Sequence, residues 1–435
     1  MELVSGAVVI DLGTERGEPD SYGSPQRSTV PGWFPAAVLA VLVLFCATAS
    51  AAPVESPLTR VFSLQVGPAD AYALTTGGQL LAQTFGTLTS YDLSTGRMSW
   101  QAGQSTPAYR LRLSEGLVLM RPWSTRPEDP GTTAISVANG AAQWERSGNV
   151  INVAGSSALL AVEAVRSLGG AGRRVQGPID AIDPLTGQTR WTVRVPSTAV
   201  LLGVPGPGDS GTRMLLVHDD RTLALHDLDT GRLLGTGKVP PADYNPNNPA
   251  VADGVILLRH PGERSVEISA YDPVTLKQMW TEPAGGTYDI KACGLLACLT
   301  GSDGTRALDP TTGDLRWSRP EWHNVEQRGA MFLAYGGADT SSPLGIVDPD
   351  TGRLRVDLTG WRPVGGDGSG DHLLVTRAVE AGARTMVAVA RPGEGRPRLL
   401  ADLPAGTGDC QAVPGRLVCR SMYGELVVWA YPREG

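Results

Sequence analysis

The sequence predicts an all-β fold, a single β-propeller of four-stranded blades, with eight blades expected and a range of seven to nine. Three observations predict it. A turn motif recurs at nearly constant spacing. Short apolar runs with strand-like alternation flank each copy. After residue 55 the chain contains no long segment with the 3.6-residue periodicity of a helix. Propeller blades are the repeat units that combine these features.

The motif is seen in the stretch YDLSTGRMSW, Tyr91–Trp100, where Asp is followed by Thr three, Gly four and Trp eight residues on. Full or partial copies start at positions 92, 136, 183, 227, 272, 309, 348 and 391, which gives a period of about 40 to 45 residues. The residues that carry the repeat are Asp92, Gly96, Trp100, Trp144, Asp183, Gly187, Trp191, Asp227, Gly231, Asp272, Trp280, Asp309, Gly313, Trp317, Asp348 and Gly352.

The order of residues within the motif indicates a hairpin turn. An Asp at the end of a strand can accept hydrogen bonds from backbone amides two residues on, and Gly takes the positive φ that a tight reversal needs. Trp on the following strand offers a large apolar surface and an indole N–H that requires a partner. Because the Asp residues recur at equal spacing, we expect each one to form its own turn and not to act as a catalytic base.

The number of blades follows from counting strands. Two further apolar runs precede each turn, as VILLRH does before Asp272, so each repeat supplies four short strands. A ninth set of strands, RLVCRSMYGELVVWAYP, ends the chain without its last strand, and the segment PLTRVFSLQV near residue 58 has the character to supply it. Direct counting therefore gives nine units. Eight is the commoner upper size, so eight is expected and nine stays open.

The N-terminal region differs from the repeats. Residues 33–52, WFPAAVLAVLVLFCATASAA, contain no charge over 20 residues, which is enough for a transmembrane helix. Residues 1–32 form an acidic, Gly- and Pro-containing stub that we expect to be disordered and cytoplasmic. The stub is long and acidic for a secretory signal, so we expect an uncleaved, single-pass anchor in the cell membrane, although Ala-x-Ala sites leave cleavage open. The propeller domain would then comprise residues 53–435 on the extracytoplasmic side.

Four cysteines fall into two local pairs, Cys293 with Cys298 and Cys410 with Cys419. Each pair brackets an expected strand-turn-strand, where neighbouring strands bring sulfurs within bonding reach. Two disulfides would indicate an oxidising compartment, and four free buried thiols remain the alternative. The spacings do not fit C-x-x-C and no histidine lies close in the sequence, so no metal site is expected.

The combination of apolar run, D-x-x-T-G and Trp at a fixed offset, as around Asp92, Asp183 and Asp309, resembles the repeats of the pyrroloquinoline quinone (PQQ)-like propeller family. That resemblance covers the chain from about residue 58 onward and implies a propeller. The family includes quinoprotein dehydrogenases and non-catalytic binding proteins. The dehydrogenases need a calcium site, an aspartate base and often adjacent cysteines, and no such residues can be matched here. The high Gly, Ala, Arg and Pro usage resembles membrane-anchored, non-catalytic members of actinobacterial type.

Charge limits the partners. The net charge is −7, and removing the stub's share of −3 (two arginines and five acids) leaves −4 for the rest, which gives no electrostatic reason to bind nucleic acid. We expect a protein-interaction scaffold or ligand-binding module with protein partners at the propeller faces, no cofactor, no catalytic machinery and attachment to the membrane through one helix. The alternative is a degenerate PQQ-dependent oxidoreductase, or a sensor that binds a small ligand in the central channel.

Overall fold

The computed structural model describes residues 33–34, 37–41, 57–103, 108–122, 131–153, 155–166, 172–206, 211–242, 244–337, 342–366, 371–379 and 384–432. By contacts the chain divides into two units, Met1–Glu55 and Ser56–Gly435. All the strands belong to the second unit. Every strand pair is antiparallel except one, β30 with β34.

The stub at 1–32 and most of the expected membrane segment at 33–52 lie outside the described residues. Of that segment only residues 33, 34 and 37–41 are described. In this described part of the chain, no helix combines the length and the apolar character needed to span a bilayer.

The described strands form eight hydrogen-bonded sheets. Five of them consist of four strands in unbroken chain order: β2 (Tyr72–Leu74), β3 (Gln79–Thr84), β4 (Thr87–Asp92) and β5 (Met98–Gly103); β6 (Ala108–Ser114), β7 (Leu117–Pro122), β8 (Thr132–Ser136) and β9 (Ala142–Arg146); β17 (Pro249–Ala252), β18 (Val255–Pro261), β19 (Val266–Tyr271) and β20 (Gln278–Pro283); β21 (Thr287–Cys293), β22 (Leu296–Gly301), β23 (Gly304–Leu308) and β24 (Leu315–Arg319); β25 (Asn324–Arg328), β26 (Met331–Tyr335), β27 (Gly345–Asp348) and β28 (Arg353–Asp357).

One sheet contains seven strands: β10 (Asn149–Asn152), β11 (Leu159–Arg166), β12 (Arg173–Ile182), β13 (Thr189–Pro205), β14 (Thr212–His218), β15 (Thr222–Asp227) and β16 (Leu233–Lys238). The long strand β13 joins two groups of four. Its first half pairs with β12 alone, its last residues pair with β14 alone, and residues 199–201 pair with both. It therefore acts as the last strand of one group and the first strand of the next.

The two remaining sheets hold the C-terminal strands. One consists of β29 (Arg362–Pro363), β31 (Leu373–Val379), β32 (Arg384–Ala390) and β33 (Arg398–Leu403). The other consists of β1 (Thr59–Gln65), β36 (Glu425–Ala430), β35 (Arg416–Arg420), β34 (Gly408–Val413) and β30 (Gly365–Gly366). With the seven-stranded sheet divided at β13, nine groups of strands follow one another along the chain.

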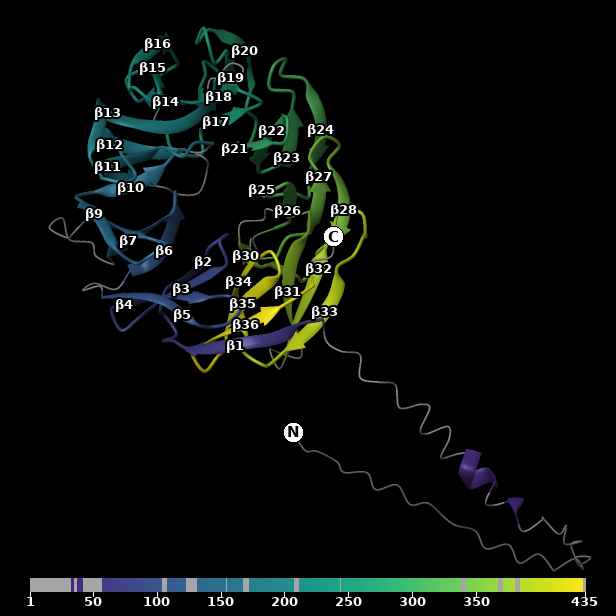
Figure 1. Ribbon diagram of the computed structural model, residues 1–435. Helices are drawn as coiled ribbons and strands as arrows, with labels where there is room; N and C mark the ends of the chain where they lie inside the picture. The colour runs from purple at the N-terminus through teal and green to yellow at the C-terminus, as the bar shows by residue number, and fades with distance from the viewer. Residues whose placement is uncertain are drawn as a thin grey trace, which may run out of the picture. The chain divides into compact units, whose positions relative to one another are not determined.

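The groups are arranged around a common centre, as in a propeller (Figure 1). First strands such as β2, β17, β21 and β25 lie toward the centre of the ring, and last strands such as β5, β20 and β28 lie outside (Figure 1). Contacts between neighbouring first strands, for example β17 with β21 and β21 with β25, agree with this order. The expected all-β propeller is therefore present.

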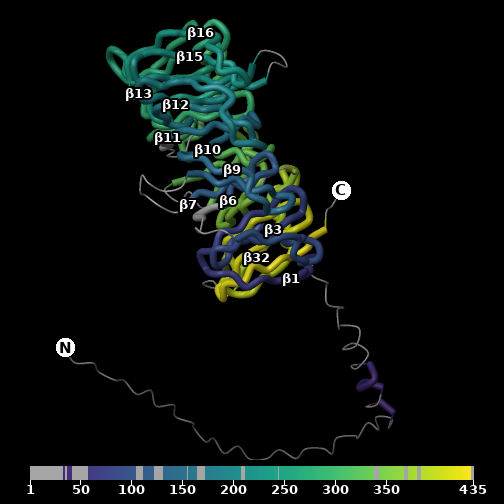
Figure 2. Tube along the Cα trace, turned by 60° about the vertical axis from the view of Figure 1, so that its left-hand side comes forward, coloured from purple at the N-terminus to yellow at the C-terminus, as the bar shows by residue number. Residues whose placement is uncertain are grey.

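The two ends of the repeat region close the ring within one sheet. β1 pairs with β36 from Thr59 opposite Ala430 to Gln65 opposite Glu425. In Figure 2 the purple β1 accordingly lies beside the yellow C-terminal strands. The expectation that the segment near residue 58 supplies the missing last strand is confirmed.

The apolar core lies between neighbouring sheets, because inner strands such as β3 bury both of their faces. Leu80 and Leu81 are adjacent on β3 and both fully buried. Leu80 packs in a cluster with Leu426 and Val428 of the preceding sheet, whereas Leu81 packs with Val118 of the following sheet. Successive side chains of a strand point to opposite faces, so one short apolar run contributes to two inter-sheet cores.

Candidate binding site

The predicted turns are present, and the Asp side chains form them. Asp92 Oδ1 accepts hydrogen bonds from the amides of Ser94 (2.9 Å) and Thr95 (2.8 Å). Gly96 has a φ of 72°, and its amide donates to the Asp92 carbonyl oxygen over 2.8 Å. The same carboxylate oxygen accepts amide hydrogen bonds in the turns that begin at Asp183, Asp227, Asp272, Asp309 and Asp348.

These hydrogen bonds lower the pKa of the turn carboxyls. Hydroxyl and amide donors from Ser94 and Thr95 lower the pKa of Asp92 to about 2. A hydrogen bond from Arg190, together with two amides, lowers the pKa of Asp183 to about 2. Because the ionised form is the better acceptor, each turn is most stable with its carboxylate charged.

A further residue of the repeat was missed in the sequence. Arg occurs seven positions after Asp in three copies, and its guanidinium pairs with Asp Oδ2: Arg190 with Asp183 (2.5 Å), Arg316 with Asp309 (2.6 Å) and Arg355 with Asp348. The constant offset is visible in the sequence and could have revealed the pairing. Each Arg side chain is at least half exposed, so each pair adds little stability.

The repeated Trp residues join each group to the next. Each indole N–H donates to a backbone carbonyl in the turn of the following group: Trp100 to Val137 (2.8 Å), Trp144 to Pro184 (2.8 Å), Trp191 to Asp229 (3.0 Å), Trp280 to Pro310 (2.9 Å) and Trp317 to Pro349 (2.8 Å). The turn Gly of that group lies against the ring. A Cβ added at Gly352 would come within 2.7 Å of Trp317, so the repeat needs Gly here for close packing as well as for φ.

Where the Trp is absent, the joints are built differently. Gly235 takes the Trp position on β16, and Leu276, with a φ of 54° and 4% exposure, takes the Gly position of the next turn. Leu276 Cδ1 lies 3.6 Å from a Cβ built at Gly235. Here the turn of the following group supplies the large side chain, whereas at the joints with Trp the last strand of the preceding group supplies it. At the ring closure, Phe62 of β1 packs against Gly96 in the place of a Trp.

Both predicted cysteine pairs are bonded. Cys293–Cys298 links β21 to β22, and Cys410–Cys419 links β34 to β35. Cys293, Cys298 and Cys419 are buried, whereas Cys410 lies at the edge of a central cavity.

This cavity, of about 930 Å³, lies on the inner strands of the ring. Its wall includes residues from five neighbouring groups, and five of these residues show its extent: Tyr72 on β2, Leu111 on β6, Arg328 on β25, Arg362 on β29 and Gln411 on β34. Because the first strands of propeller blades surround the axis, this wall belongs to the central channel.

A crossover of one inner strand shapes the cavity wall. β29 remains paired with β31, whereas β30 leaves that sheet and pairs in parallel with β34, Gly365 opposite Gln411. A Cβ at Gly365 would lie 3.2 Å from the Cys410 carbonyl oxygen, so small residues permit this close approach. As a result β31 has an inner neighbour over only part of its length.

The charges in the wall are unequally compensated. Arg328 pairs with Glu326 (2.9 Å), and Asp409 pairs with Arg420 (3.1 Å). Among the described residues, the Arg362 guanidinium has no ion-pair or hydrogen-bond partner. The Arg377 guanidinium lies over the ring of Trp361, 5.4 Å from its centroid, and has no acidic partner in the same described part. Two uncompensated cations therefore face this cavity.

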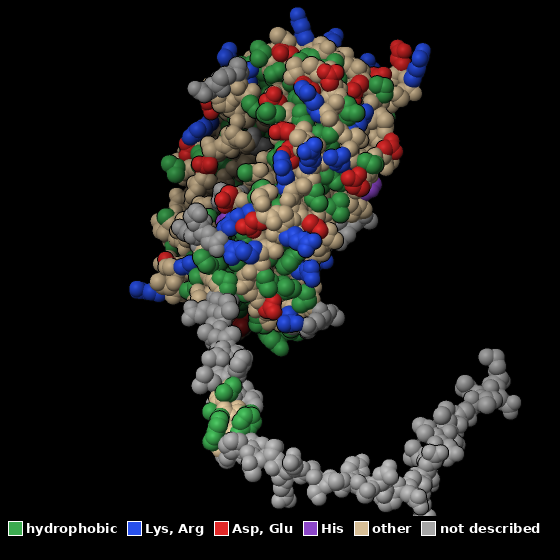
Figure 3. All heavy atoms as spheres, turned by 90° about the vertical axis from the view of Figure 1, so that its right-hand side faces the viewer, with side chains coloured by type: hydrophobic (Ala, Val, Ile, Leu, Met, Phe, Trp, Pro, Cys, Tyr) green, Lys and Arg blue, Asp and Glu red, His purple; other side chains and the backbone are tan. Residues whose placement is uncertain are grey.

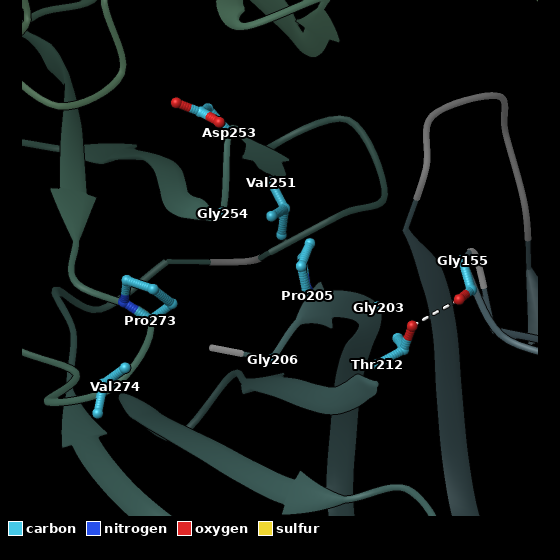
Figure 4. Close-up of a pocket in the computed structure, with 10 residues that line it drawn as sticks. All are labelled: Gly155, Gly203, Pro205, Gly206, Thr212, Val251, Asp253, Gly254, Pro273 and Val274. Atoms are coloured by element: carbon cyan, nitrogen blue, oxygen red, sulfur yellow. Dashed lines mark hydrogen bonds between the residues drawn. The ribbon is translucent and has the colours of Figure 1, made fainter. Parts of the chain in front are cut away.

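A smaller pocket of about 530 Å³ is lined by residues of three successive groups (Figure 4). Thr212 donates to the Gly155 carbonyl oxygen over 2.6 Å at one end, and Pro273 and Val274 of the Asp272 turn form the other. Apolar side chains and backbone atoms make up most of the described wall, in which Asp253 is the one ionisable residue.

On the side shown in Figure 3, Lys and Arg alternate with Asp and Glu. Within the described ranges, no three His, Cys, Asp or Glu side chains come together in a way that could hold a metal ion.

Together, the Asp turns, the Trp contacts and the ring of four-stranded groups define a repeat β-propeller of the PQQ-like class. A family model described as outer membrane protein assembly factor BamB matches residues 55–199 and 175–419. The chain belongs to this family.

Solved structures with similar folds are distant from this chain. BamB from Moraxella catarrhalis is 16% identical, with 86% of this chain and 100% of that chain covered and a TM-score of 0.40. The computationally designed Ika8 protein is 13% identical (85% and 99% covered, TM-score 0.38), and the quinohemoprotein alcohol dehydrogenase ADHIIG from Pseudomonas putida HK5 is 12% identical (67% and 73% covered, TM-score 0.37). No curated protein matches the chain.

Proposed function

We propose that this protein is a membrane-tethered, extracytoplasmic β-propeller that binds a protein partner and serves as an interaction scaffold without catalytic machinery. One observation carries the proposal. The Asp and Trp side chains of the repeat have structural roles: the Asp carboxylates accept hydrogen bonds from turn amides, and the Trp indoles donate to backbone carbonyls of the next group. Membership of a family described by an assembly factor supports a role in protein binding.

The tether and its orientation rest on the sequence. Residues 33–52 carry no charge, and an anchored chain with the two cysteine pairs oxidised fits a propeller outside the cytoplasm. This is the arrangement of the membrane-anchored, actinobacterial-type proteins that the sequence resembles. Protease treatment of intact cells tests it: the propeller should be digested from outside, and protection until lysis would contradict the orientation.

The partner is sought by proximity crosslinking in native membranes, followed by mass spectrometry. The proposal expects the same neighbouring proteins in repeated experiments, and their loss when the described propeller is replaced by an unrelated domain on the same anchor. If no neighbour is recovered reproducibly above that matched control, the scaffold proposal fails.

A second candidate function is a degenerate quinone-dependent oxidoreductase or small-ligand sensor. The 930 Å³ cavity on the inner strands favours it, because the volume is within the range of ligand pockets. Adding PQQ and Ca²⁺ to the purified protein tests this function. A shifted absorbance spectrum with calcium-dependent dye reduction would support an enzyme, and an unchanged spectrum would leave the binding role.

We further propose that each of the nine strand groups is one blade. The shared strand β13 and the closing strand β1 each complete a four-stranded set, which supports nine in place of the eight expected. An experimental density map at side-chain resolution would test the count, and a ring of eight radial sheets would contradict it.

A further inference from the structure

We propose that the central cavity binds an extended, carboxylate-rich peptide segment of a partner protein, with Arg362 and Arg377 as the anion-binding residues. The inference rests on the proposed scaffold function and specifies the chemistry of the partner. Three features of the cavity carry it: its uncompensated charge, an unpaired strand edge and its size.

The charge selects an anion. Of the three arginines in the wall, Arg328 is neutralised by Glu326 at 2.9 Å, which leaves Arg362 and Arg377. Among the described residues of the wall, the one carboxylate is that of Asp409, and it pairs with Arg420 at 3.1 Å. The described part of the wall thus carries two uncompensated positive charges, in a chain of net charge −7. Guanidinium groups bind carboxylates through two parallel hydrogen bonds, which makes such a ligand the best match.

The backbone selects an extended chain. β31 is paired with β32 over its whole length, from Leu373 to Val379, but β29 covers only Val375 and Thr376 on the inner side. The Leu374 carbonyl oxygen accepts from the Val364 amide, so Leu374 directs its polar groups inward. In an antiparallel strand this direction alternates, so Ala378 also directs its N–H and C=O inward.

As far as the described residues go, the inner edge at Ala378 is open. Its counterpart by register would be Gly360, where the chain has already turned away with a φ of 78°. No described backbone group pairs with Ala378 on this side, and Ala378 is exposed in the cavity wall beside Arg377. A peptide that lies along this edge can hydrogen-bond to Ala378 while its acidic side chains reach the arginines.

The size of the cavity favours a peptide over a small anion. At about 930 Å³ it is near the upper end of ordinary ligand pockets, so a single phosphate or citrate would fill only part of it. Polar side chains line the remainder, including Thr376, Thr385 and Gln411. An extended peptide contacts the arginines and these groups together.

Fluorescence anisotropy with the full-length protein in detergent tests the inference. The probe is fluorescein-labelled hexaglutamate, with labelled hexalysine as the charge-reversed control and citrate as the competitor. The protein variants are Arg362→Gln, Arg377→Gln, the double variant, and Arg97→Gln as the matched control, because Arg97 is an exposed turn arginine outside the cavity wall. The melting temperature of each variant shows that it is folded.

We expect hexaglutamate to bind and hexalysine not to bind. Each cavity substitution should weaken hexaglutamate binding about tenfold, the double variant about a hundredfold, and Arg97→Gln should leave it unchanged. Binding should weaken as NaCl is raised from 50 to 300 mM. The inference is overturned if hexaglutamate does not bind, if the cavity variants bind it as the wild type does, or if citrate binds as tightly.

The result separates this inference from the scaffold proposal. Partners that are still crosslinked to the double variant as to the wild type would contradict the cavity as the docking site and keep the scaffold function. A neighbour lost in the double variant and kept in Arg97→Gln would support both.

Discussion

At the residue scale, the repeat motif is explained by three contacts. Asp closes the turn by accepting amide hydrogen bonds, Gly provides a positive φ and room for a ring, and Trp binds the next turn. Each of these contacts involves residues close in sequence or one repeat apart. For that reason the spacing of Asp, Gly and Trp is regular along the chain.

Substitutions of Trp317 measure how much the contact between groups contributes to the free energy of unfolding. Its indole N–H donates to Pro349 O, and its side chain is 7% exposed. Trp317→Phe keeps most of the ring but leaves the carbonyl without its donor, so we expect a loss of about 1 kcal/mol in the free energy of unfolding. Trp317→Ala also empties the site and should cost about 3–5 kcal/mol. Urea unfolding measures both, and equal losses would contradict the separate role of the hydrogen bond.

The Asp turns predict how stability depends on pH. The folded pKa of Asp92 is about 2, below the unfolded value of about 3.9, so the stabilisation is complete above pH 4 and is lost as the pH falls toward 2. Asp92→Asn removes the carboxylate and should melt at a lower temperature than the wild type at pH 6. The difference in melting temperature should shrink toward zero near pH 2. A difference that stays constant with pH would contradict the turn carboxylate as its source.

At the scale of elements, neighbouring groups pack with one large side chain opposite one small residue, and either group can supply the large one. Most joints place Trp on the last strand and Gly in the following turn, whereas the joint after β16 places Gly235 on the strand and Leu276 in the turn. Either arrangement fills the gap with one large side chain. Two large or two small side chains would overpack it or leave a cavity.

Exchanging the small residue at Gly235 and the large one at Leu276 tests this packing. Leu276→Gly removes a buried side chain and should destabilise the protein by about 2–4 kcal/mol. Gly235→Trp introduces a ring against Leu276 and should cost about 1–3 kcal/mol. The double variant restores the arrangement of the other joints, so its loss should be smaller than the sum by about 1–3 kcal/mol. Urea unfolding of the four proteins in a double-mutant cycle measures this coupling, and strict additivity would contradict it.

At the scale of the whole molecule, the ring is closed by strands from both ends of the repeat region. β1 provides the outer strand of the last group, and Phe62 on β1 packs against Gly96 of the first group. The closure therefore depends on one strand that holds two neighbouring groups together.

Removal of β1 should open the ring. A variant that lacks residues 57–66 exposes the edge of β36 and removes the Phe62 contact, so we expect a broader and earlier thermal transition. Differential scanning calorimetry measures it. A scrambled strand of the same composition in the same place is the control for chain length. If the deleted variant melts as sharply and as high as the wild type, β1 is not needed for closure.

The sequence by itself was sufficient for the all-β class, the turns, the need of each Trp indole for a partner and both cysteine pairs, because these features depend on residues that are close in sequence or repeat at a fixed distance. The closing role of the segment near residue 58 was also predictable, since a strand was missing at the C-terminus. The Arg seven residues after Asp was visible but was missed.

Only the tertiary structure decided the features that break the repeat. The shared strand β13, the crossover of β30 to β34 and the open edge at Ala378 depend on which strands from distant groups become neighbours. Arg362 and Arg377 carry no sequence signal, because an arginine is recognised as uncompensated only after the carboxylates around it have been placed. Local hydrogen bonding and side-chain period define each group from its own sequence, whereas the channel and its charge arise only when the ring closes.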